Sequence, residues 1–250
     1  MHDNSKPLAI SMGEPAGIGP DCILQSYAAL KSAGTAPKLI VFGDPALFES
    51  RAARLDLDIK VTGLSHVEQA SDLPTGTLAV VHIGNVADAP GALDPATGIH
   101  TVAAIRTALD SIKAGVCSGL VTAPIHKSNL YATGFAFPGH TEFLEDYART
   151  HDPDSNPLAV MMLAGPELRT VPVTVHIPLH QVASSLTTAR IVEIGTRTAQ
   201  DLIGRFGIVY PRLAIAGLNP HAGEDGALGA EDEAVIAPAV AALKNAGIDA

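Results

Sequence analysis

The chain has 250 residues, 47% of them hydrophobic and 17% charged, so it can bury the core of one large or two small domains and leaves little room for disorder. A formal net charge of -10 argues against non-specific nucleic-acid binding, which needs clustered Lys and Arg. No apolar run approaches the ~20 residues that span a bilayer, and the first six residues lack the apolar core of a signal peptide, so we expect a cytoplasmic protein. Cys22 and Cys117 are isolated, and we expect both to be small buried residues rather than disulfide or metal ligands.

Strands and helices are predicted to alternate along most of the chain. The expected strands are Leu8–Met12, Leu39–Phe42, Leu78–Ile83, Gly119–Thr122, Leu158–Leu163, Thr170–Val175 and Leu213–Ala216. The expected helices begin near Asp21, Pro45, Thr97, Thr141 and Thr188, with Asp44 as the cap of the second and Gly34 as the end of the first. This alternation predicts an α/β protein with a largely parallel sheet that is covered by helices on both faces.

Domain organisation is marked only weakly in the sequence. The Pro/Gly-rich passage Ala123–Gly139 is the best candidate for a boundary, and we place the first domain at residues 1–125 and the second at 126–250. Near the end, residues 242–247 repeat the pattern of residues 29–34, which precede a predicted strand. Here the chain stops at Ile248–Ala250, so we expect the next strand to be missing and the architecture to be incomplete.

The loop Gly13–Pro20 is glycine-rich but does not match the standard phosphate-binding patterns. It has neither Gly-x-Gly-x-x-Gly nor a Lys-Ser/Thr ending, and Pro15 and Pro20 lack the N–H donors of such a cradle. A tight structural turn is the favoured interpretation, with substrate or interface contact second. Glu14 is either a carboxylate that faces a ligand or a solvated loop residue.

The segment Phe137–Phe143 combines rigid Pro and Gly residues with polar side chains at a predicted helix start. His140, Thr141 and Glu142 would lie beside the positive end of the helix dipole, where an anionic substrate is favoured. An ordinary helix cap explains the same pattern equally well. Lys127 follows a strand and is either a partner for a phosphate or carboxylate or a solvated lysine.

Two histidines, His176 and His221, each follow an apolar run that reads as a strand, and loops at the carboxyl ends of strands form the ligand crevice of open α/β sheets. A shared divalent metal is one interpretation, since imidazole suits zinc and related ions, but catalytic sites usually have three protein ligands. The other interpretation is that each histidine forms a hydrogen bond with a nearby carbonyl group and binds no metal. His180 is not an obvious third ligand, because Pro178 argues against a single helix face with His176.

Four motifs together resemble the 4-hydroxythreonine-4-phosphate dehydrogenase family of pyridoxal phosphate biosynthesis, in family order and over essentially the whole chain. They are Gly13–Pro20, Thr122–Lys127, Phe137–Phe143 and Gly217–Glu224. The resemblance implies two α/β/α domains similar to those of isocitrate and isopropylmalate dehydrogenases, with the active site in an interdomain cleft at a homodimer interface. It implies that His140 and Thr141 bind substrate, and that His176 and His221 are two of three histidines that hold zinc, magnesium or cobalt.

The family pattern also continues past the position of Ala250. That continuation carries the third metal histidine, substrate-binding Lys, Asn and Arg residues, much of the nicotinamide site and the end of the first domain. We therefore expect the sequence to be a fragment or a truncated product. The resemblance leaves the catalytic and cofactor-binding residues of this chain unassigned.

The implied reaction is the oxidation of 4-phosphohydroxy-L-threonine by NAD or NADP, followed by decarboxylation to 3-amino-2-oxopropyl phosphate. Three alternatives stay open from the sequence. The first is a paralogous dehydrogenase of D-threonate or D-erythronate 4-phosphate, which differs in substrate. The second is a metal-dependent hydrolase that uses His176 and His221 without nicotinamide. The third is a catalytically silent binding module, favoured by the missing segment.

Overall fold

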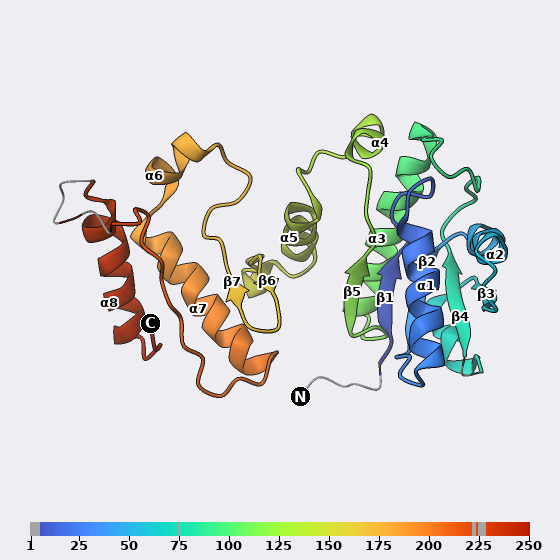
Figure 1. The fold of residues 1–250 in the computed structure, drawn as a ribbon, viewed down its shortest axis with the longest axis horizontal. Coiled ribbons are helices and arrows are strands. Elements are labelled where there is room, and N and C mark those ends of the chain that lie inside the picture. The colour runs from blue at the N-terminus through green and yellow to red at the C-terminus, as the bar shows by residue number, and fades with distance from the viewer. Residues whose placement is uncertain (1–5, 75, 222–223, 225–228) are drawn as a thin grey trace. The chain divides into compact units, whose positions relative to one another are not determined.

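The computed structural model describes residues 6–74, 76–221, 224 and 229–250, and the chain divides into two compact units at residues 136 and 137. The division falls inside the Pro/Gly-rich passage Ala123–Gly139. Figure 1 shows the elements of each unit. Among the described residues, no helix is long and apolar enough to cross a membrane.

The unit that ends at residue 136 is built on a five-stranded parallel sheet with the order β3-β4-β2-β1-β5. Its strands are β1 (Leu8–Ser11), β2 (Leu39–Gly43), β3 (Lys60–Leu64), β4 (Thr77–His82) and β5 (Gly119–Thr122). Its helices are α1 (Gly19–Ser32), α2 (Pro45–Arg54), α3 (Gly98–Lys113) and α4 (Lys127–Ala132). The predicted strands at 8–12, 39–42, 78–83 and 119–122 are confirmed within one residue at each end.

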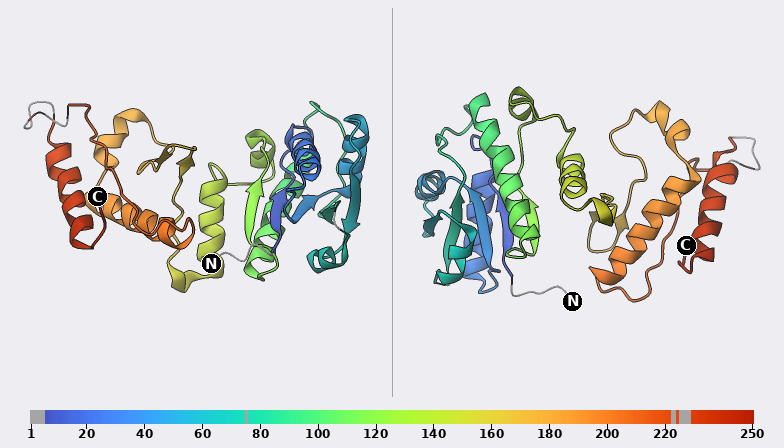
Figure 2. Two further views of the ribbon diagram at one scale, coloured as in Figure 1. Left: turned by 60° about the horizontal axis from the view of Figure 1, so that its bottom comes forward. Right: turned by 180° about the vertical axis from the view of Figure 1, so that it is seen from behind.

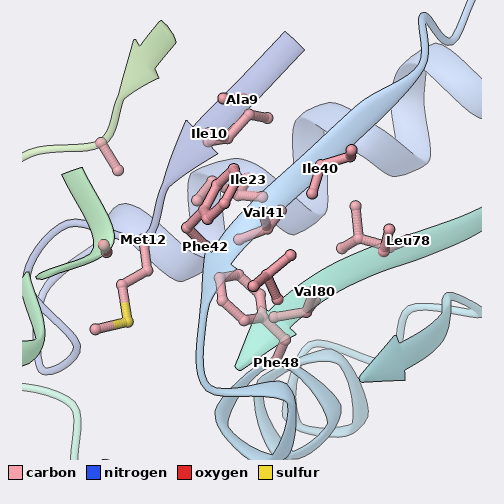
Figure 3. Close-up of a cluster of buried hydrophobic side chains, with 14 of the residues drawn as sticks. Ala9, Ile10, Met12, Ile23, Ile40, Val41, Phe42, Phe48, Leu78 and Val80 are labelled. Atoms are coloured by element: carbon pink, nitrogen blue, oxygen red, sulfur yellow. The ribbon is translucent and has the colours of Figure 1, made fainter. Parts of the chain in front are cut away.

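Helices α1 and α3 cover opposite faces of this sheet, as the front and back views show (Figures 1 and 2). The core lies between them and is made of strand residues with no exposed surface, such as Val41, Phe42 and Val80, joined by Phe48 of α2 (Figure 3). Strands buried on both faces are typical of parallel sheets, which explains why these segments are continuous apolar runs in the sequence.

Strand β3 was not predicted. It lies at the edge of the sheet, pairs only with β4, and begins at the exposed residue Lys60. Its sequence, Lys-Val-Thr-Gly-Leu, has neither an apolar run nor a clear alternation. Helix α2 matches its prediction, because the side chain of Asp44 accepts a hydrogen bond of 3.0 Å from the backbone N–H of Ala46 and Pro45 occupies the first turn.

Helices make up most of the regular structure in the unit of residues 137–250. They are α5 (His140–His151), α6 (Val182–Ser185), α7 (Thr188–Gly204) and α8 (Ala237–Asn245), the last preceded by a π-helical turn at Asp232–Ile236. Helices α7 and α8 pack closely, since a Cβ atom on Gly195 would lie 3.0 Å from Leu243. Ile191, Ile236 and Ala239 form the buried centre of this unit.

The three strands predicted in this unit, Leu158–Leu163, Thr170–Val175 and Leu213–Ala216, were largely wrong, because most of their residues pair with no other strand in the described part of the chain. Among the described residues, the only ladder is the antiparallel pair β6 (Leu163–Ala164) and β7 (Arg169–Thr170), and the segment 213–216 forms none. Leu213 makes a single strand-like contact by donating its N–H to the carbonyl of Asp249 at 2.8 Å. The apolar residues of 171–173 and 213–216 instead line a cavity of about 680 Å³ against α7. Most of these residues are only half-buried there, and Ala214 and Ala216 are exposed, so the apolar runs predict neither a ladder nor full burial in this unit.

One further expectation is corrected by the fold. Cys117 is buried, but Cys22 is exposed on α1. Its neighbours Ile23 and Leu24 carry the buried face of that helix, so Cys22 falls on the outer face.

Candidate active site

The loops that follow β1 and β5 meet at the carboxyl edge of the sheet. The N–H of Glu14 donates to the carbonyl of Pro124 at 2.9 Å, and residues Glu14–Gly17 form a turn closed by a 3.0 Å bond from the N–H of Gly17 to the carbonyl of Glu14. Because α1 and α3 lie on opposite faces, this is the point at which the strand order reverses, where open α/β sheets bind ligands. The predicted tight turn is confirmed.

Glu14 is neither solvated nor directed at an open ligand site. It is 4% exposed, and its two carboxylate oxygens accept hydrogen bonds from the N–H of Ala16 at 3.2 Å and from the side-chain amide of Asn129 at 3.0 Å. Both interpretations of Glu14 from the sequence were therefore wrong. Asn129 was missed, because a single Asn in a short helix has no distinguishing sequence pattern.

Arg51 of α2 holds the same turn from the other side. Its guanidinium is 1% exposed and donates to the carbonyl oxygen of Pro15 at 3.1 Å, while Asp21 and Asp88 lie 2.9 and 2.8 Å away as its ion-pair partners. Lys127, by contrast, is exposed at the first position of α4.

In the second unit, α5 begins at His140, as the sequence predicts, with Gly139 as its N-cap. His140, Thr141 and Glu142 therefore occupy the first turn, beside the positive end of the helix dipole. The buried ring of Phe143 packs edge-on against Phe137 at a centroid separation of 5.4 Å, which fixes the approach to the helix. This geometry accommodates an anionic group at His140 and Thr141 and is equally that of a well-anchored helix start.

His176 lies in a loop and contacts this first turn. Its Nε2 atom is 3.7 Å from Oε1 of Glu142, so the structure brings together the segment 137–143 and one predicted metal histidine. The backbone of His176 has φ = +58°, a left-handed conformation that is rare for residues other than glycine. His180 lies in a separate 3-10 turn capped by Pro178, which agrees with the argument against a shared helix face.

His221 is presented by a turn that Asn219 and Asp232 hold in place. The backbone N–H of His221 donates to the side chain of Asn219 at 2.9 Å, and the N–H groups of Leu218 and Asn219 donate to the carboxylate of Asp232 at 2.9 and 3.2 Å. Nδ1 of His221 lies 2.9 Å from Oε1 of Glu224. Residues Ala222 and Gly223 of the predicted motif are outside the described residues. The sequence did not single out Asp232, which holds the loop from the π-helical turn that begins 14 positions after Leu218.

The two histidines fit a divalent metal by the chemistry of their donors. Each has one ring nitrogen facing a carboxylate, the arrangement usual for histidine ligands, which leaves the second nitrogen for a metal. Within the described residues, no group of three or more His, Cys, Asp and Glu side chains is placed to hold a metal ion, so His176 and His221 do not form part of such a group here.

Comparison with known proteins gives the family. A family model described as pyridoxal phosphate biosynthetic protein PdxA matches residues 35–250. The chain is 44% identical over 246 residues to 4-hydroxythreonine-4-phosphate dehydrogenase from Xanthobacter autotrophicus, which covers 98% of this chain and 69% of the relative. It is 43% identical over 255 residues to the protein of that name from Bradyrhizobium diazoefficiens, covering 98% and 73%.

Solved structures agree with the sequence relatives. The 4-hydroxythreonine-4-phosphate dehydrogenase of Klebsiella pneumoniae superposes with a TM-score of 0.81 at 30% identity, over 98% of this chain and 73% of that one. The family and the α/β fold class predicted from the sequence are confirmed. The chain therefore belongs to the PdxA family and is an oxidoreductase of the dehydrogenase type.

Proposed function

We propose that the chain catalyses the NAD- or NADP-dependent oxidation of 4-phosphohydroxy-L-threonine to 2-amino-3-oxo-4-phosphooxybutanoate, which then loses carbon dioxide to give 3-amino-2-oxopropyl phosphate. The observation that carries this proposal is the relationship to enzymes named 4-hydroxythreonine-4-phosphate dehydrogenase, at 44 and 43% identity over 98% of the chain. The position of His140 and Thr141 at a helix N-terminus supports it, because the substrate is anionic.

In this mechanism, His140 and Thr141 bind an anionic group of the substrate at the start of α5. The oxidation removes a hydride from the carbon that bears the 3-hydroxyl and a proton from that hydroxyl. Bound NAD or NADP would supply the hydride acceptor, and the proton would pass to solvent. His176 and His221 would hold a divalent metal, which supplies polarisation of the reacting oxygen and stabilises the negative charge of the decarboxylation step. The product of oxidation is a β-keto acid, and its carboxylate leaves as carbon dioxide with the electron pair delocalised toward the keto group. The carbon that carried the carboxylate then takes up a proton from solvent to give the aminoketone.

The experiment is a spectroscopic assay of reduced nicotinamide formation, with NAD or NADP and with zinc, magnesium or cobalt. Turnover of 4-phosphohydroxy-L-threonine is expected, and turnover only of D-threonate or D-erythronate 4-phosphate would assign the paralogous activity. Hydrolysis without nicotinamide would indicate a hydrolase, and binding without turnover a silent module. His221→Ala is expected to abolish both turnover and metal binding while the circular dichroism spectrum stays unchanged. Unchanged turnover with full metal content would contradict the metal role.

We also propose that the chain acts as a homodimer. Light scattering at several protein concentrations tests this proposal directly. A mass of one chain at all concentrations would contradict it.

A further inference from the structure

Glu142 connects the helix start at His140 with the loop of His176. It lies in the first turn of α5, and its Oε1 atom is 3.7 Å from Nε2 of His176. Its other oxygen, Oε2, is buried and has no hydrogen-bond partner among the described residues. The side chain is 28% exposed, with one oxygen near an imidazole and the other buried and able to accept hydrogen bonds.

His176 needs an external restraint if its ring is to keep one orientation. It lies outside helices and strands, its side chain is 47% exposed, and its backbone is in the left-handed region. Such backbone conformations persist where the surrounding structure enforces them. Glu142 is the charged group that the structure places beside the ring, on a helix anchored by the buried Phe143.

We propose that Glu142 is a positioning residue that orients the imidazole of His176 and fixes its tautomer for metal binding. The inference rests on the proposed role of His176 as a metal ligand. A carboxylate that accepts from Nε2–H keeps the proton on that nitrogen and leaves the lone pair of Nδ1 for the metal. The 3.7 Å separation is an ion-pair distance that is too long for a hydrogen bond, and it is expected to shorten to one when metal is bound.

This arrangement has a specific consequence for the two histidines. His176 faces its carboxylate through Nε2, whereas His221 faces Glu224 through Nδ1. These contacts leave Nδ1 of His176 and Nε2 of His221 available, and these atoms would hold the metal. Glu142 belongs to a different segment of the chain from its histidine, so its contribution also ties the start of α5 to the metal loop.

The test measures Zn²⁺ binding to the 250-residue chain by calorimetry. Glu142→Ala is expected to weaken Zn²⁺ binding by about 10- to 100-fold, the effect typical of removing such a partner. Glu142→Gln preserves the side-chain volume and removes only the charge, so it separates loss of the carboxylate from a folding defect. It is expected to weaken Zn²⁺ binding by a smaller factor than Glu142→Ala. Glu193→Ala is the matched control, because Glu193 is a glutamate on α7 that pairs with the surface residue Arg190, and it is expected to leave Zn²⁺ affinity unchanged.

A double variant shows whether Glu142 acts through His176. In a His176→Ala background, Glu142→Ala is expected to cause no further loss of Zn²⁺ affinity. Nitrogen NMR of the metal-free chain gives a second readout, in which His176 is expected to be protonated on Nε2 and to become a mixture of tautomers in Glu142→Ala.

The outcomes separate this inference from the proposed function. If the unmodified chain binds Zn²⁺ and Glu142→Ala binds it equally well with the same tautomer, the positioning role is overturned and the metal site stands. If the unmodified chain binds no Zn²⁺ while the tautomer still depends on Glu142, the metal role fails and the orienting contact stands. If neither measurement responds to Glu142, the inference is overturned.

Discussion

The side-chain amide of Asn129 donates a hydrogen bond of 3.0 Å to Oε2 of Glu14, although the two residues are 115 positions apart in the chain. Both side chains are buried, at 3 and 4% exposure. The same amide lies 3.4 Å from the carbonyl of Asp94. One asparagine therefore joins the loop after β1, the start of α4 and the turn before α3 at the carboxyl edge of the sheet.

Asn129→Ala is expected to lower the free energy of unfolding by about 1–3 kcal/mol, because it removes a hydrogen bond from a buried carboxylate. Urea denaturation followed by circular dichroism measures this change. Ser128→Ala is the control, since the neighbouring Ser128 is exposed and its hydroxyl forms a surface hydrogen bond of 2.9 Å with the ring of His126. Equal, small effects of the two substitutions would show that the Asn129 contact contributes little.

The contribution of Asp88 to the free energy of unfolding is expected to depend on pH. Burial alone would raise the pKa of Asp88, but the hydrogen bonds from Ser50 and Arg51 and the charges of Arg51 and Arg54 outweigh it, and the pKa lies below its ordinary value of 3.8. A carboxyl group whose pKa is depressed by folding stabilises the folded state above the unfolded pKa. That contribution is lost as the pH falls through the folded value.

Asp88→Asn is therefore expected to cost about 2 kcal/mol at neutral pH, the scale of a hydrogen bond to a charged group. The difference from the unmodified chain should shrink as the pH falls below about 4. Urea denaturation at a series of pH values measures it, with the exposed residue Asp58 changed to Asn as the control. A difference that stays constant down to strongly acidic pH would exclude the charge as its origin.

The sequence predicts the first unit better than the second for a physical reason. Strands such as β2 and β4 are covered on both faces and appear as continuous apolar runs, which a single-sequence pattern reveals. The edge strand β3 has one neighbour and a mixed sequence, so its pairing depends on β4. In the apolar run 213–216, two residues are half-buried and two are exposed, and no local signal states whether another strand lies alongside.

The features of the candidate site likewise fall into those that the local sequence predicts and those that depend on contacts between distant residues. The helix start at His140 and the turn at Glu14 follow from local Pro, Gly and dipole chemistry, and the structure places them as expected. The partners Asn129 and Glu142 act across long sequence distances. Such contacts are properties of the fold, and no spacing rule in one sequence predicts them.

Gly13 and Gly34 form a matched pair for separating backbone strain from steric clash. Both have left-handed backbones, with φ of +72° and +67°, but a Cβ on Gly13 would lie 2.5 Å from the carbonyl oxygen of Pro124, whereas nothing lies within 4 Å at Gly34. Gly34→Ala is expected to cost about 1–2 kcal/mol from the left-handed conformation alone. Gly13→Ala should cost clearly more, measured by urea denaturation. Equal costs would mean that the loops after β1 and β5 separate easily.

The two cysteines are expected to differ sharply in reactivity. Burial raises the pKa of the Cys117 thiol, against a weaker lowering by the hydrogen bond with Ser111, and Cys117 is 2% exposed. Cys22 is exposed on α1. Because the thiolate is the reacting species, a colorimetric disulfide reagent at neutral pH should modify one thiol quickly and the second only after denaturant is added. Cys22→Ser should remove the fast phase and leave the slow one, whereas rapid modification of two thiols in the native chain would contradict the buried position of Cys117.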